Sequence, residues 1–176
     1  MVSDPPNAMT LSTANYIPQP DGTTCGPTSA HNLLLNWGQN VSIDHLKIDL
    51  GWTTNGTPLD SDWPTTLNDH SASTYYVIGW SPSETTTWAA FVGDTLDGHP
   101  FILLVSMSPS RGYLYGYPQD REWGHYVTGN GYSGYRSGTK YGRYFDQYNG
   151  LAYTYGEHEV PLSTWVTMLY QNGIVW

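Results

Sequence analysis

The chain has 176 residues, of which 39% are hydrophobic and 15% aromatic, and its formal net charge is −9. This length and hydrophobic content predict one globular domain with its own core. The negative charge argues against general nucleic-acid binding, because such binding depends on Lys and Arg that neutralise phosphates. The longest apolar run, residues 101–105, is much too short to cross a bilayer, so no membrane segment is predicted.

Residues 1–14 mix Pro, Ser, Asn and Asp without a hydrophobic period, which predicts a flexible N-terminal arm before a single domain over residues 15–176. After Cys25, apolar residues at positions 30, 33, 34 and 37 have the spacing of a buried helical face, and Gly38 is expected to end this helix. A second helix is predicted over 42–50, and another turn or two within 60–71.

The second half of the chain is richer in strand patterns. We predict strands at 74–80, 100–107, 124–130, 142–147, 151–160 and 174–176, and helices at 83–98 and from residue 161. Helices come first and an antiparallel sheet dominates the later part. This order is typical of an α+β fold and not of alternating βαβ units.

Cys25 is the only cysteine, so the chain forms no intramolecular disulfide. Without CxxC or paired Cys/His spacings, we expect no metal site. A thiol nucleophile needs no organic cofactor, and none is expected. The sequence does not open with a signal-peptide pattern. The scarcity of Lys beside many Ser, Thr, Gly, Tyr and Trp residues nevertheless favours an extracellular protein, secreted with a signal since removed. We expect it to be monomeric.

Cys25 lies at the predicted start of a helix, where the partial positive charge of the helix N-terminus favours a thiolate. The ordinary alternative is a small buried hydrophobic residue. The flanking Gly-Thr-Thr and Gly-Pro form a turn context that would present the side chain and not bury it. Cys25 is therefore a candidate nucleophile.

A thiolate nucleophile needs a histidine whose ring is held in place. Among the six histidines, His31 is six residues along the same helix and points roughly 240° away from Cys25. His45, His70, His99 and His158 are interpreted as ordinary surface or locally bonded histidines.

His125 has a predicted partner. If its hairpin pairs Asn130 near Tyr141, the paired residue numbers add up to 271 and place His125 opposite Asp146, with Cβ atoms ~5 Å apart. If the chain had no candidate nucleophile, His125 and Asp146 would be interpreted as an ordinary cross-strand pair on the surface.

Gln19 is a candidate donor to an oxyanion. The side-chain amide of a glutamine shortly before the nucleophile can reach the position of the oxyanion, and each such donor is worth ~3 kcal/mol. Alone, a Gln beside a Pro is only a loop residue. The specificity of the prediction comes from Gln19, Cys25, His125 and Asp146 together.

Three segments resemble papain-like cysteine peptidases, and more closely the C39-like branch related to bacteriocin-processing peptidases. They are PQPDGTTCGPTSAHNLL (18–34), GHYVTGNGY (124–132) and YFDQYNG (144–150). The resemblance implies a papain-like α+β fold in which a central helix starting at the cysteine packs on an antiparallel sheet.

The same resemblance implies roles for single residues. Cys25 would be the nucleophile, His125 the general acid/base, Asp146 the orienting acid and Gln19 the oxyanion donor, and Asn149 is the alternative to Asp146. We expect three neighbours of His125 to contact substrate: Trp123, Gly124 and Tyr126.

The implied function is hydrolysis of a peptide or isopeptide bond in a peptide or protein substrate, through a thioester acyl-enzyme. Two alternatives stay open. One is a cell-wall amidase or transpeptidase that uses the same residues. The other is a peptide- or glycan-binding module on a peptidase fold.

Overall fold

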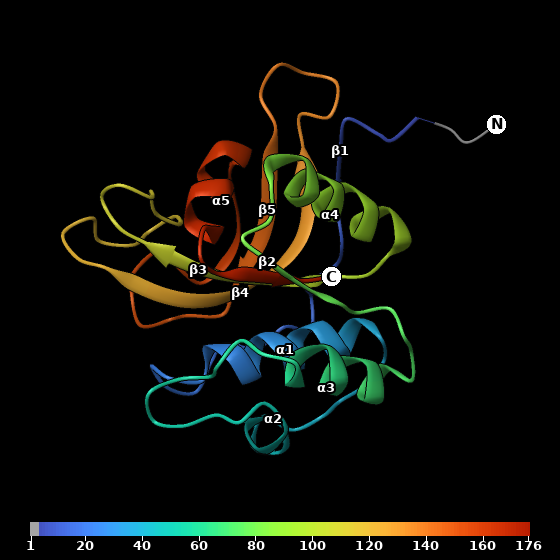
Figure 1. The fold of residues 1–176 in the computed structure, drawn as a ribbon, viewed down its shortest axis with the longest axis vertical. Helices are drawn as coiled ribbons and strands as arrows, with labels where there is room; N and C mark the ends of the chain where they lie inside the picture. Colours follow the sequence, from blue (N-terminus) through green and yellow to red (C-terminus); the bar gives the residue numbers. More distant parts are fainter. Residues whose placement is uncertain (1–3) are drawn as a thin grey trace.

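The computed structural model describes residues 4–176. A seven-stranded antiparallel sheet carries helices on both sides (Figure 1). The strands are β1 (Ala8–Thr10), β2 (Ile78–Trp80), β3 (Phe101–Met107), β4 (Trp123–Ser133), β5 (Tyr141–Asp146), β6 (Gly156–Pro161) and β7 (Gly173–Val175). The helices are α1 (Cys25–Asn36), α2 (Ile43–Asp49), α3 (Asp62–Ser71), α4 (Glu84–Asp97) and α5 (Leu162–Leu169). The predicted α+β class is confirmed.

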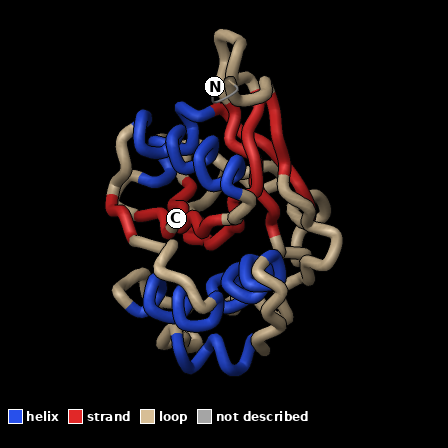
Figure 2. Tube along the Cα trace, turned by 90° about the vertical axis from the view of Figure 1, so that its right-hand side faces the viewer, coloured by secondary structure: helices blue, strands red, loops and turns tan. Residues whose placement is uncertain are grey.

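The strand order is β2-β7-β3-β4-β5-β6, and β1 pairs with β4 outside this path. The long strand β4 pairs with β3 along its first half and with β5 along its second half. In Figure 1, α1, α2 and α3 lie below the sheet, and α4 and α5 lie above it. Figure 2 shows the same separation, with strands between two groups of helices.

The side chains of β4 alternate between two cores, which is why helices cover both faces. Tyr126 joins the core under α1 and α3, where its ring stacks on Trp63 with ring centroids 4.8 Å apart. Val127 joins the other core, which contains Phe91 of α4 and Trp165 of α5. Within the described residues, no helix combines the length and apolar character needed to cross a membrane.

Helix α1 forms as its apolar spacing predicts. Its inward face buries Ala30, Leu33 and Leu34 completely. The chain leaves the helix through Gly38, whose φ of 73° lies in the left-handed region that glycine adopts without strain.

The N-terminal segment corrects one expectation. Instead of a flexible arm, residues 8–10 are an ordered strand whose Ala8 lies opposite Ser133 and whose Thr10 lies opposite Gly131. The end of β4 offers backbone groups beyond the reach of β3, and the segment pairs with them. Residues 1–3 of the predicted arm lie outside the described residues.

The strand predicted at 74–80 is shorter in the structure, where β2 spans Ile78–Trp80. Just before it, the side chain of Asn68 in α3 accepts a hydrogen bond from the backbone N–H of Tyr76 and donates one to its carbonyl, both at 2.8 Å. A side chain therefore satisfies this backbone in place of a neighbouring strand.

The position after Cys25 has no space for a side chain, and glycine occupies it. A Cβ at Gly26 would lie 2.6 Å from Oγ1 of Thr57, in a loop packed against the start of α1. By contrast, a Cβ at Gly93 in α4 would have no heavy atom within 4 Å.

We therefore expect Gly26→Ala to lower the free energy of unfolding by about 1–3 kcal/mol through overpacking. Gly93→Ala should leave it unchanged or raise it by up to about 1 kcal/mol, because alanine favours a helix interior. Urea unfolding of both variants measures these changes. Equal stability of the two variants would contradict the close packing of Thr57 on Gly26.

Candidate active site

Cys25 is the first residue of α1, and its free thiol belongs to a partly exposed residue. Backbone N–H groups in the first turn of a helix have no acceptor within the helix. They give this end of the helix a partial positive charge, which favours a thiolate. The preceding loop is held in place from outside the helix. The indole N–H of Trp52 donates to the carbonyl of Thr23 at 2.9 Å, and Oδ1 of Asp21 accepts from the N–H of Thr23 at 2.8 Å.

His125 lies on β4 and is 5% exposed. Its Nε2 atom is 2.8 Å from Oδ1 of Asp146, whose side chain is completely buried. The thiol of Cys25 lies close enough to the imidazole for each group to shift the pKa of the other. The structure thus brings together three of the four predicted residues in the order thiol, imidazole, carboxylate.

The contact between His125 and Asp146 is present, but the register that predicted it is wrong. Thr128 lies opposite Phe145, so paired numbers add up to 273 and not 271. Extending this register places Asp146 opposite Val127, two residues from His125. A shift of two residues keeps side chains on the same face of a sheet, so the pair still meets on the diagonal.

The error comes from the end of the hairpin. The strands continue until Ser133 lies opposite Tyr141, beyond the turn that the sequence predicted at Asn130. A bulge between Gly129 and Gly131 then changes the register by one. Bulges of this kind carry no reliable signal in a single sequence.

Burial raises the pKa of the Cys25 thiol, but the hydrogen bond and charge of His125 and the backbone N–H groups of Tyr126 and Gly26 more than offset it. The pKa therefore lies below the ordinary value of 9.0. Burial lowers the pKa of His125, whereas Asp146 and then Cys25 raise it, to about 10 against an ordinary 6.5. Both shifts favour the thiolate and imidazolium forms together.

Two tyrosines that sequence reasoning missed complete the surroundings of Asp146. The hydroxyl of Tyr117 donates to Oδ2 at 3.1 Å, and the backbone N–H of Tyr148 donates to Oδ1 at 2.8 Å. Burial and the neighbouring carboxylate raise the pKa of Tyr117, so its hydroxyl stays a donor. The tyrosine-rich composition of residues 108–123 was the only signal for Tyr117. Asn149, the alternative to Asp146, is exposed.

Gln19 is buried, and its Nε2 donates to the carbonyl of Asp21 at 2.6 Å. That bond fixes which end of the amide is the donor and leaves the second N–H of Nε2 for another acceptor. Gln147, also missed from sequence, links the two sides of the site. Its side-chain amide donates to the backbone carbonyl oxygens of Cys25 and Tyr126, and its backbone carbonyl accepts from the backbone N–H of Gln19 at 2.9 Å.

Two of the three predicted substrate contacts line a pocket beside His125. This pocket, of about 60 Å³, is lined by Gln19, Gly22, Tyr117, Trp123, Gly124, His125 and Tyr148. Trp123 and Gly124 also line a larger neighbouring pocket of about 270 Å³ that contains Arg111 and Glu122.

Tyr126 corrects the third prediction. It is 2% exposed, stacks on Trp63 and donates its hydroxyl to the carbonyl of Thr57, so it belongs to the core under α1. Neighbouring residues of a strand face opposite sides, and His125 faces the site, so Tyr126 must face away.

The residues that could hold a metal lie elsewhere. Within residues 4–176, one group of three His, Cys, Asp or Glu side chains has metal-ligand spacing, and it consists of His45, Asp49 and His70 on α2 and α3.

Comparison with known proteins supports the fold and identifies the family. The peptidase domain of Streptococcus ComA, a bi-functional ABC transporter involved in a quorum sensing pathway, has a crystal structure that matches 91% of this chain and 94% of its own, at a TM-score of 0.51 and 16% identity. At this identity the likeness shows a shared fold. No curated protein sequence matches the chain significantly. The family model described as "Peptidase_C39 like family" matches residues 12–172, and the chain therefore belongs to the Peptidase C39-like family.

Proposed function

We propose that this protein, a cysteine peptidase at the level of its family, hydrolyses a peptide or isopeptide bond with Cys25 as nucleophile, His125 as general acid and base, and Asp146 as the positioning residue. The observation that carries this proposal is the buried pair of His125 and Asp146, 2.8 Å apart, beside a thiol at the start of a helix. The family membership supports a peptide as substrate.

In the first half of the reaction, the thiolate of Cys25 attacks the carbonyl carbon, and the carbonyl oxygen takes up the negative charge. The backbone N–H of Cys25 and the second N–H of the Gln19 side chain are the donors proposed to stabilise it. When the tetrahedral intermediate collapses, the C–N bond breaks and imidazolium His125 gives its proton to the leaving amine. The acyl group stays on sulfur as a thioester.

In the second half, neutral His125 takes a proton from water, and the resulting hydroxide attacks the thioester. The C–S bond breaks, the carboxylic acid product leaves, and the thiolate and imidazolium are restored. Asp146 keeps the imidazole in one orientation through both halves and stabilises its charged form. No metal or organic cofactor takes part in these steps.

A transpeptidase or cell-wall amidase would use the same residues, with a different acceptor or scissile bond. Nothing in the site favours either over hydrolysis of a peptide. For a peptide- or glycan-binding module, the paired imidazole and thiol would have no use. On the strength of its composition alone, we further propose that the protein acts outside the cell. We also propose that it acts as a monomer.

The first test concerns the ion pair. Because the pKa of Cys25 is lowered and that of His125 is raised, the thiolate should persist well below pH 9. We expect rapid alkylation of Cys25 by iodoacetamide at neutral pH, and at least about a tenfold slower reaction in His125→Ala.

The control is His158→Ala, which removes a histidine bonded to the carbonyl of Thr154 and should label like the wild type. The measurement is the labelling rate against pH, followed by mass spectrometry. A rate that rises only near the ordinary thiol pKa, and is equal in all three proteins, would mean that Cys25 and His125 do not act together.

The second test separates the roles of the residues. We expect Cys25→Ala to abolish turnover of a peptide library without loss of fold. Asp146→Asn should lower kcat by about 10²–10⁴-fold with KM little changed, because the imidazole loses its orienting charge. Asn149→Ala, which alters the exposed alternative, should retain wild-type kcat. Full turnover by Cys25→Ala would refute the proposed mechanism.

The third test concerns the pocket. A Cβ at Gly22, which also lines this pocket, would have no heavy atom within 4 Å, so the fold should tolerate Gly22→Val, which narrows the pocket beside His125. We expect kcat/KM to fall at least about tenfold at an unchanged thermal midpoint. Gly138→Val, at an equally open position in the loop between β4 and β5, is the control. Unchanged kcat/KM in Gly22→Val would show that substrate does not use this pocket.

A further inference from the structure

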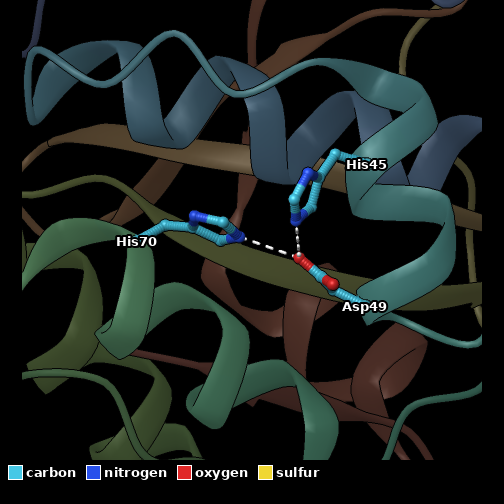
Figure 3. Close-up of side chains that lie close together, drawn as sticks. All are labelled: His45, Asp49 and His70. Atoms are coloured by element: carbon cyan, nitrogen blue, oxygen red, sulfur yellow. Dashed lines mark hydrogen bonds and ion pairs between the residues drawn. The ribbon is translucent and has the colours of Figure 1, made fainter.

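Two histidines and one aspartate converge at the contact between α2 and α3. These two helices carry none of the proposed catalytic residues. Nε2 of His45 is 3.3 Å from Oδ2 of Asp49, and Nε2 of His70 is 2.8 Å from the same oxygen. The ligand atoms of all three residues lie within 4.8 Å of one another. Figure 3 shows both rings pointing their Nε2 atoms at the aspartate.

We propose that His45, Asp49 and His70 bind a divalent transition-metal ion of the Zn²⁺ type, with water in the remaining position. Two imidazoles and one carboxylate form a donor set that suits such ions and not Mg²⁺ or Ca²⁺, which prefer all-oxygen sites. Three protein ligands and an open position are usual for accessible zinc sites. No metal site is predicted from the sequence, because that prediction considers only spacings that contain cysteine.

The two separations from Asp49 fit with small side-chain movements, and the donor atoms of the two imidazoles, which lie within 4.8 Å of each other, have room to come together. Bonds of 2.0–2.1 Å in a tetrahedral site place neighbouring donor atoms about 3.3 Å apart. Nε2 of His45 and Oδ2 of Asp49 already have this separation. The distance from Nε2 of His70 to Oδ2 of Asp49 is about 0.5 Å shorter than this separation. The two atoms form a hydrogen bond, which a shared metal ion would replace.

The backbone that holds these ligands is fixed. His45 and Asp49 are four residues apart on α2, which places them on one face of that helix. Leu46 and Leu50 beside them are completely buried in the core that also contains Leu67 of α3. The two helices are therefore locked together before any metal binds, and only exposed or half-buried side chains have to move.

The ion would connect α3 to the helix that supports the loop before Cys25. Lys47 of α2 lies over the ring of Trp52 at 4.8 Å from its centroid, and Trp52 donates to the carbonyl of Thr23. Binding to the folded state alone would raise the stability of the helical layer.

The test must exclude the active-site thiol, because a thiolate beside an imidazole also binds Zn²⁺. We would therefore titrate Zn²⁺ by calorimetry into tag-free, chelator-treated Cys25→Ala protein, and record its thermal midpoint with and without Zn²⁺. We expect one equivalent bound and a higher midpoint.

Three further changes are made in the same Cys25→Ala background. His45→Gln and Asp49→Asn should each weaken Zn²⁺ affinity at least about tenfold and remove the shift in midpoint. His158→Gln, which removes a histidine outside the cluster, should bind Zn²⁺ as its parent does. Because His45 is largely exposed, His45→Gln should fold normally, and its zinc-free midpoint checks this.

Unaltered Zn²⁺ affinity in His45→Gln and Asp49→Asn would overturn the proposal and assign binding to other surface groups. Absence of binding by the Cys25→Ala protein at zinc concentrations up to about 1 mM would overturn it too, and would leave the three side chains as a hydrogen-bonded contact between helices. Neither result bears on the activity proposed for Cys25.

Discussion

The buried carboxylate of Asp146 is the group on which the arrangement of this site depends. An ionised carboxylate removed from water is very costly unless charge and hydrogen bonds compensate for it. Here His125, Tyr117 and the backbone of Tyr148 supply those partners within 3.1 Å. The tyrosine-rich loop after β3, the end of β5 and strand β4 must all be in place together for the carboxylate to be buried.

This requirement explains why the site forms where the helical layer meets the sheet. Cys25 begins α1 on one side, whereas His125 and Asp146 belong to the sheet. Gln147 joins the two sides by donating to carbonyls of both α1 and β4. Because these two bonds tie the first residue of α1 to the strand that carries His125, they contribute to the alignment of thiol and imidazole.

The hairpin of β4 and β5 was predictable from the sequence in part. The pattern of β4 and β5 correctly predicted a hairpin and the face shared by His125 and Asp146, because side-chain alternation has a period of two. It did not predict the register, because a bulge and the length of the hairpin loop depend on neighbours such as β1 and β3. Tyr126 was misassigned for a related reason, since closeness in sequence to His125 does not mean a shared face.

The sequence by itself determined the start of α1, the thiol at that start, the α+β order of elements and the face of the sheet that His125 and Asp146 share. These follow from local periodicity and from the chemistry of a few side chains. Only the tertiary structure decided that Tyr117 and Gln147 belong to the site, that residues 8–10 form a strand, and that His45 and His70 converge on Asp49. Each of these contacts joins segments that lie far apart in the chain or on different elements. Such contacts leave no local pattern in the sequence. Only the packing of helices and sheet around a common core brings them together.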